Sequence, residues 1–122
     1  MVSQEQMKAV LQSYVDGFAA GDPAAVAGLF ADDAVIEDPV GHPPVQGRAA
    51  IDEFYANAVG AGTKLTLDTP IRGSHGSRAA MAFTVEVPAM GIRIRAIDVL
   101  TFGEDGKVTR MEAFWGPDDI EQ

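Results

Sequence analysis

Residues 92–102 read Ile92-Arg93-Ile94-Arg95-Ala96-Ile97-Asp98-Val99-Leu100-Thr101-Phe102, an alternation of side chains that is typical of a β-strand. Successive side chains of a strand point to opposite faces, so one face of this strand is apolar from Ile92 to Phe102. Asp98 lies on that same face, whereas Arg93 and Arg95 lie on the other. The strand therefore predicts a carboxyl group that points into an apolar interior.

A carboxyl group in that position has to be neutral or paired. An ionised carboxylate that is buried without a partner costs several kcal/mol, and the two nearby arginines face away from it. A neutral carboxylic acid is a hydrogen-bond donor, which suits a substrate oxygen on which negative charge develops. A β-bulge would instead shift the register and return Asp98 to solvent. The strand by itself does not separate these two interpretations.

The remaining sequence predicts helices first and antiparallel strands afterwards. Ser3 and Gln6 can form a capping box at the start of a first helix that Gly21 ends, and Asp22-Pro23 begins a second, short helix. A third helix is expected from about residue 48 to residue 59, after a brief strand at 34–38. Turn sequences separate further strands at 63–72, 78–87, 92–102 and 107–115. This order implies one α+β domain over residues 1–122, with the helices on one face of a twisted antiparallel sheet.

Composition excludes several classes of function. The formal net charge of −9 argues against nucleic acids and anionic membranes as partners. The chain has no cysteine, and its two histidines, His42 and His75, are too far apart in loops to suggest a metal site. We find no signal peptide, transmembrane segment or cofactor-binding motif, so we expect a cytoplasmic protein without cofactors.

Two further residues are candidates for chemistry. Tyr14 lies on the apolar stripe of the first helix, so its hydroxyl needs a partner inside the protein. Asp38 ends a short apolar strand directly before Pro39, which restricts Asp38 to extended conformations. Taken alone, Tyr14 is more often a core residue bonded to a backbone carbonyl, and Asp38 is more often a solvated carboxylate.

Together, Tyr14, Asp38 and Asp98 form the minimum set for moving a proton next to a carbonyl group. Removing an α-proton leaves an enolate, whose oxygen needs prepositioned donors in a dry site. Tyr14 and a protonated Asp98 would donate hydrogen bonds, and Asp38 would take the proton.

Several segments along nearly the whole chain carry a family resemblance. They are Tyr14, the run Ala31-Asp32-Asp33-Ala34-Val35-Ile36-Glu37-Asp38-Pro39-Val40-Gly41, Glu53-Phe54-Tyr55-Ala56-Asn57, Ala82-Phe83, Ile97-Asp98-Val99 and Ala113-Phe114-Trp115. With these segments the chain resembles the bacterial ketosteroid isomerases (steroid Δ5-isomerases) of the NTF2-like, SnoaL-like superfamily. The resemblance implies an NTF2-like cone in which three N-terminal helices pack on a curved antiparallel sheet. It also implies a homodimer that uses no cofactor.

The resemblance also implies roles for individual residues. The counterpart of Asp38 carries a proton from C4 to C6 of a 3-oxo-Δ5-steroid, while the counterparts of Tyr14 and Asp98 bind the dienolate oxygen. Ketosteroid isomerases are an established case of a carboxylic acid kept neutral by an apolar site, so a raised pKa for Asp98 comes from the family and not from the strand pattern. Tyr55 matches a tyrosine that supports the oxyanion donor, but a third tyrosine of some members is Phe30 here.

Substrate-binding positions follow from the same resemblance. They are Tyr55, Phe54, Phe83 and Trp115, and their aromatic rings suit a flat apolar ligand. For each of them, and for Phe54 in particular, ordinary core packing is the alternative. Two other functions are also compatible with the sequence: a SnoaL-like polyketide cyclase or hydratase that uses the same base and donors, and a non-catalytic NTF2-like binding or dimerisation module.

Overall fold

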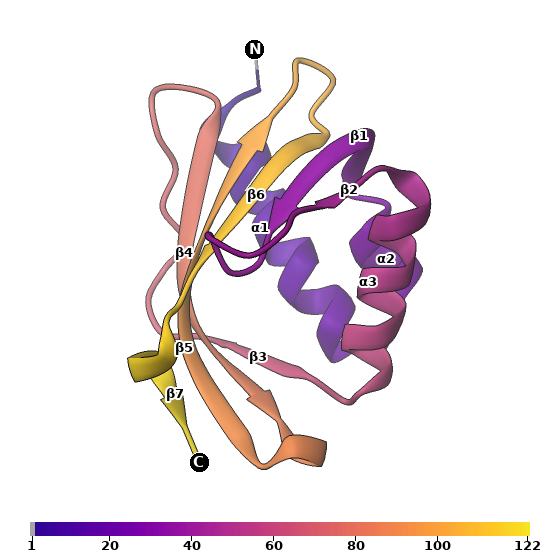
Figure 1. Ribbon diagram of the computed structural model, residues 1–122. Helices are drawn as coiled ribbons and strands as arrows, with labels where there is room; N and C mark the ends of the chain where they lie inside the picture. Colours follow the sequence, from indigo (N-terminus) through magenta and orange to yellow (C-terminus); the bar gives the residue numbers. More distant parts are fainter. Residues whose placement is uncertain (1) are drawn as a thin grey trace.

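The computed structural model describes residues 2–122 and contains three helices that lie on one side of a curved sheet (Figure 1). The α-helices are α1 (Gln4–Ala19), α2 (Pro23–Ala27) and α3 (Arg48–Gly60). The strands are β1 (Phe30–Glu37), β2 (Val45–Gln46), β3 (Lys64–Leu67), β4 (Arg78–Val87), β5 (Ile92–Phe102), β6 (Val108–Phe114) and β7 (Ile120–Glu121), with short 3-10 helices at Pro88–Met90 and Pro117–Asp119. None of the described helices is long and apolar enough to cross a membrane.

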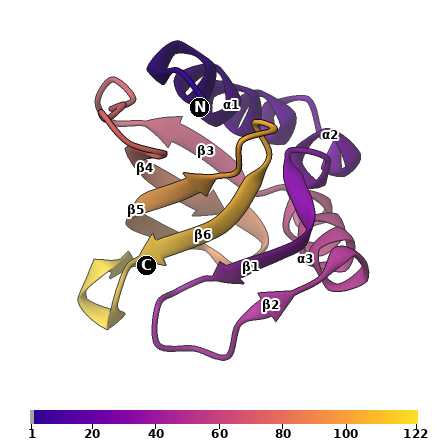
Figure 2. The same cartoon turned by 90° about the horizontal axis from the view of Figure 1, so that it is seen from above.

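The strands form a sheet in the order β2-β1-β6-β5-β4-β3, and β7 pairs with the early part of β5. Figure 2 shows the sheet curving around the helices, which lie on its concave side near β1 and β3. This arrangement confirms the predicted α+β fold with three helices on a curved sheet. One pair departs from the antiparallel pattern, because β1 and β6 run parallel, joined through the long excursion that contains α3 and β3–β5.

Most predicted boundaries agree with the structure. The capping box of Ser3 and Gln6 is formed, Asp22 caps α2, and β4 and β5 have the expected ends. The strand expected at 34–38 is longer at its start, and the strand expected at 63–72 is shorter, with a single isolated bridge at Arg72. The two-residue strands β2 and β7 were not predicted, because so short a segment carries no periodic pattern.

The register of β5 decides the position of Asp98. Its pairing with β4 is unbroken from Ile92 to Thr101, and the irregularity in its pairing with β6 comes only after Thr101. The bulge that would have returned Asp98 to solvent is therefore not present at this position. The Asp98 side chain is 1% exposed, and its strand neighbours Ile97 and Val99 face the other side of the sheet.

The core lies between the helices and the concave face of the sheet. It is built from the apolar stripes of α1 and α3, the inner residues of β1 and the inner residues of β4–β6. Close packing of these elements fixes the residues that line a cavity at one end of the core. Burial of Leu11, Ile51 and Leu100, none of which is exposed, holds the helices on the sheet.

Candidate active site

A cavity of about 170 Å³ opens between the helices and the concave face of the sheet. Most of its wall is apolar, and its polar side chains are those of Tyr14, Asp38, Thr63, Asp98 and Trp115. The apolar residues that line it are Phe18, Phe54, Ala58, Leu65, Phe83, Val85, Val87, Ile94, Ala96 and Ala113. All three residues that we predicted to carry chemistry therefore meet in a single cavity, although they come from α1, from the end of β1 and from β5.

Asp98 lies in the middle of the sheet, paired with Met81 of β4 on one side and with Ala113 of β6 on the other. Its Oδ1 atom is the one buried side-chain oxygen or nitrogen without a hydrogen-bond partner within residues 2–122. Burial raises the pKa of the Asp98 carboxyl well above its ordinary value, and the nearby charge of Asp38 raises it further. A protonated Asp98 thus presents a hydrogen-bond donor to the cavity.

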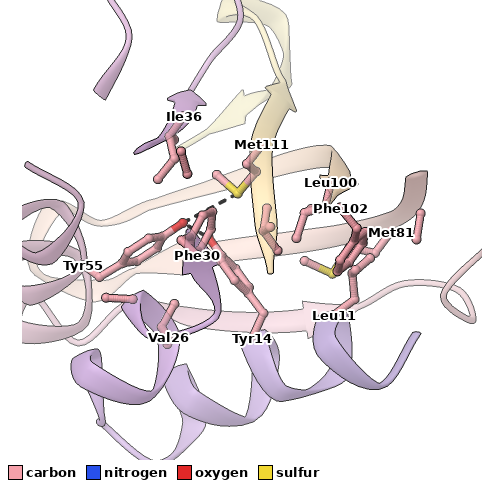
Figure 3. Close-up of a cluster of buried hydrophobic side chains, with 14 of the residues drawn as sticks. Leu11, Tyr14, Val26, Phe30, Ile36, Tyr55, Met81, Leu100, Phe102 and Met111 are labelled. Carbon is pink, nitrogen blue, oxygen red and sulfur yellow. Dashed lines mark hydrogen bonds between the residues drawn. The ribbon is translucent and has the colours of Figure 1, made fainter. Parts of the chain in front are cut away.

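Tyr14 occupies the face of α1 that packs against the sheet and is 4% exposed. Its hydroxyl oxygen lies 3.0 Å from that of Tyr55 in α3, and Figure 3 shows the two rings meeting in the aromatic part of the core. Burial raises the pKa of the Tyr14 hydroxyl well above its ordinary value, with a further rise from Tyr55 and then Asp98. Tyr14 is therefore a neutral donor at physiological pH.

Asp38 directly follows β1, and the chain before and after it is hydrogen-bonded to β6. Glu37 pairs with Glu112, and the backbone N–H of Val40 donates to the carbonyl of Ala113 at 2.9 Å. The side chain is fixed as well, because Trp115 Nε1 donates to Asp38 Oδ1 at 2.9 Å. These contacts hold one carboxylate oxygen and leave Oδ2 for another partner.

The pKa of Asp38 is raised from its ordinary value, mainly because the side chain is largely buried. The hydrogen bond from Trp115 and the nearby His42 both oppose this rise. The site thus holds two carboxyl groups in different surroundings. Asp98 is buried, and its Oδ1 has no hydrogen-bond partner in the described part of the chain, whereas Asp38 accepts a hydrogen bond from Trp115. Environments of this kind separate a proton acceptor from a proton donor.

The four predicted substrate-binding residues divide into two groups. Phe54, Phe83 and Trp115 line the cavity, and Phe54 also packs edge-on against Tyr55 with ring centroids 5.0 Å apart. Tyr55 does not line the cavity: it is fully buried behind Tyr14, so it contacts a ligand only through that residue.

Other sequence-based expectations concern the surroundings of the site. Phe30 packs against Tyr55 with ring centroids 5.4 Å apart, and its side chain has no polar atom that could bond to the tyrosine pair. Glu37 is only 19% exposed and forms an ion pair with Arg110. His42 and His75 are exposed.

Two contacts of the site were not predicted from the sequence. One is the hydrogen bond of Trp115 to Asp38, and the other is the contact of Tyr55 with Met111, whose Sδ lies 3.6 Å from the tyrosine hydroxyl. Apolar lining residues such as Phe18 were also missed as part of the cavity, because the same periodic pattern describes a core residue and a cavity wall.

Comparison with known proteins assigns the family. The profile of the SnoaL-like domain matches residues 11–111. The chain is 44% identical over 117 residues to a steroid Delta-isomerase of Nocardioides simplex, covering 94% of both proteins. It is 33% identical over 125 residues to the epoxide hydrolase LasB of Streptomyces lasalocidi, covering 98% of this chain but only 44% of LasB.

A solved structure agrees with these matches. The epoxide hydrolase/cyclase-like enzyme SalBIII, which has a role in pyran ring formation in the polyether salinomycin, superimposes with a TM-score of 0.89. The two chains are 31% identical, and the match covers 98% of each. From the matching profile, the relatives and the shared fold, we conclude that the chain belongs to the SnoaL-like family of NTF2-like proteins.

Proposed function

We propose that the protein is a steroid Δ-isomerase, which converts 3-oxo-Δ5-steroids into 3-oxo-Δ4-steroids without a cofactor. The observation that carries this proposal is that one apolar cavity contains both hydrogen-bond donors and a carboxyl group that can accept a proton. Asp98 and Tyr14 are buried donors with raised pKa values, and Asp38 is a carboxyl group with one oxygen held by Trp115. The identity of 44% with a steroid Delta-isomerase over 94% of both chains supports the same reaction.

The reaction needs one base and one oxyanion site. Asp38 Oδ2 takes a proton from C4 of the substrate, and the electrons of the C–H bond form the C3–C4 double bond while the carbonyl oxygen becomes negative. In the second step Asp38 delivers the proton to C6: the electrons of the C5–C6 double bond form the new C–H bond, the C3–C4 double bond shifts to C4–C5, and the C3 carbonyl is restored. No proton or electron enters from outside, so Asp38 suffices as the one proton carrier.

Tyr14 and Asp98 stabilise the dienolate between the two steps. Both donors lie in the buried part of the cavity, where a hydrogen bond to a developing negative charge is worth far more than in water. Asp98 can donate only while it is neutral, and its burial provides that condition. Removing one such donor typically costs about 10²–10³-fold in rate.

The size of the cavity determines how a steroid would bind. Its volume of about 170 Å³ is below the roughly 300–1,000 Å³ of pockets that enclose a whole drug-sized ligand. We therefore expect the reacting ring and its neighbour to enter, with Phe54 and Phe83 on the walls, while the far rings lie at the mouth.

The test is a rate measurement on a 3-oxo-Δ5-steroid, in which the conjugated enone product is followed by its ultraviolet absorbance. The wild-type protein should form the enone, and Asp38→Asn, which keeps the shape but removes the base, should lose at least about 10²–10⁴-fold in rate. Asp33→Asn, which removes an exposed carboxylate from the same strand, is the matched control and should retain the wild-type rate. A wild-type protein that forms no enone would remove the basis of the proposal.

A second candidate function is the opening of an epoxide, because LasB is described as an epoxide hydrolase and SalBIII as an epoxide hydrolase/cyclase-like enzyme. The same groups would serve: Tyr14 and Asp98 would donate to the epoxide oxygen, and Asp38 would take the proton of the attacking hydroxyl. A hydroxy-epoxide substrate, assayed alongside the steroid, separates the two. A polyketide cyclase or hydratase would transform neither substrate, and a non-catalytic binding module would bind the steroid without converting it.

We also propose a homodimer formed through the outer face of the sheet. Ile97 and Phe114 lie directly opposite each other on β5 and β6 and are 49% and 46% exposed, which leaves an apolar patch on this face. Light scattering should give the mass of two chains for the wild-type protein and of one chain for Ile97→Lys. For the cellular location, the cytoplasm predicted from the sequence is our proposal, to be checked by fractionation.

A further inference from the structure

The hydroxyl group of Tyr55 has two partners in the structure. One is the hydroxyl of Tyr14 at 3.0 Å, and the other is the Sδ atom of Met111 in β6 at 3.6 Å (Figure 3). Tyr55 and Met111 are both fully buried, and Tyr14 is 4% exposed, so bulk water does not compete for these contacts. Phe30, on another side of Tyr55, contributes only its ring.

These contacts set the direction of the hydrogen bonds. A thioether sulfur accepts but cannot donate, so the contact with Met111 requires Tyr55 to donate its proton to the sulfur. The Tyr55 oxygen is then free to accept the proton of Tyr14. In the free enzyme both tyrosine hydroxyls therefore donate a hydrogen bond: Tyr14 donates to the Tyr55 oxygen, and Tyr55 donates to the Met111 sulfur.

An oxyanion in the cavity changes this order. Under the proposed function, on which this inference rests, Tyr14 donates to the substrate oxygen, so its own oxygen becomes a better acceptor through polarisation. Sulfur is a weak acceptor, and Tyr55 gains by turning its proton from the sulfur to Tyr14. We propose that Met111 is a positioning residue. Its sulfur accepts the hydrogen bond of the Tyr55 hydroxyl in the free enzyme, and this hydroxyl turns to donate to Tyr14 when the oxyanion forms.

A weak acceptor is suited to this role for an energetic reason. With no acceptor at position 111, the Tyr55 proton would already point to Tyr14, and Tyr14 would direct its own proton into the cavity before any ligand arrives. With a strong acceptor, Tyr55 would keep its bond and Tyr14 would act alone. Met111 thus accepts a hydrogen bond from the buried Tyr55 hydroxyl in the free enzyme, and breaking this weak bond costs little free energy when Tyr55 turns to Tyr14.

The test replaces Met111 with leucine, which conserves most of the side-chain volume but removes the sulfur. In the ligand-free protein, NMR of the hydroxyl protons should show that Met111→Leu shifts the Tyr55 signal. Met7→Leu makes the same change at another fully buried methionine, which has no hydrogen bond to a tyrosine, and should leave that signal in place. An unmoved Tyr55 signal in Met111→Leu would overturn the proposal whether or not the protein acts on steroids.

The second measurement uses a phenolic steroid, whose phenolate imitates the dienolate. Loss of the competing acceptor should make Met111→Leu bind it about 2–5-fold more tightly, with a larger ionised fraction in the ultraviolet spectrum. In a Tyr55→Phe background, no hydroxyl remains to be held, so Met111→Leu should have no effect. An equal effect in both backgrounds would mean that Met111 acts through packing alone. Failure of the proposed function would look different, since the wild-type protein would then form no enone, whereas the Tyr55 signal of Met111→Leu would still shift.

Discussion

Replacing Asp98 with asparagine should raise the stability of the protein relative to the wild type progressively as the pH rises above about 4. Asp98 is 1% exposed and its Oδ1 has no hydrogen-bond partner in the described chain, so its ionised form is strongly disfavoured in the folded state. In the unfolded chain the carboxyl group ionises near its ordinary pKa of about 3.9. Between that pH and the raised pKa of the folded state, the folded protein holds a proton that the unfolded chain has lost.

The sign and size of the effect follow from this difference in bound protons. Because the folded state binds more protons, the free energy of unfolding falls with rising pH, by about 1.4 kcal/mol per pH unit for this one group. Asparagine cannot ionise, so in the variant this side chain does not lower the free energy of unfolding as the pH rises. The stability of Asp98→Asn relative to wild type should therefore be constant below about pH 4 and increase by about 1.4 kcal/mol per unit above it, until the pH reaches the raised pKa.

Urea unfolding of both proteins from about pH 3 to about pH 7 measures this difference directly. The contribution of Asp38 cancels in the comparison as long as Asp98 stays neutral in the folded wild-type protein. Asp33→Asn, at an exposed position, should show no such slope. A stability difference for Asp98→Asn that is independent of pH, or that shrinks as the pH rises, would refute a neutral Asp98.

Three further predictions concern activity. Asp98→Asn keeps a donor and should retain appreciable activity, whereas Asp98→Leu should lose about 10²–10³-fold in kcat yet remain folded, as an unfolding curve can verify. Tyr55→Phe should reduce kcat less than Tyr14→Phe does, because Tyr55 acts through Tyr14; the reverse ranking would show that the primary donor is misassigned. Trp115→Phe removes a hydrogen bond that lowers the pKa of Asp38, so the acid-side fall of kcat/KM should begin at a higher pH than in the wild type. An unchanged pH profile would mean that Trp115 only lines the wall.

The parts of this site that could be predicted from the sequence are those with a local signal. The alternation of β5 placed Asp98 on the inner face, and the apolar stripe of α1 placed Tyr14 there too. Neither pattern reports which residues meet across the fold. The contact between Trp115 and Asp38 joins positions 77 apart in the chain, and it depends on the parallel pairing of β1 with β6.

The bond from Tyr55 to Met111 was missed for a related reason. An inward methionine on a strand predicts core packing, and only the three-dimensional placement of a hydroxyl 3.6 Å from its sulfur distinguishes an acceptor from a filler. The division of roles between Asp38 and Asp98 was predicted from the chemistry of the residues, and the family resemblance implied the same roles. The structure adds a physical basis for that division, because Trp115 donates to Asp38, whereas Asp98 Oδ1 has no hydrogen-bond partner among the described residues.

The central claim is that Asp38 carries one proton from C4 to C6 in a cavity that holds the oxyanion. A 3-oxo-Δ5-steroid deuterated at C4 tests it most directly, with mass spectrometry and NMR locating the label in the enone product. We predict that the wild-type protein forms the enone with deuterium retained in part at C6, and that Asp38→Asn forms it at least about 10²-fold more slowly. Enone formed equally fast by Asp38→Asn, or enone from the wild type without any label at C6, would contradict the account.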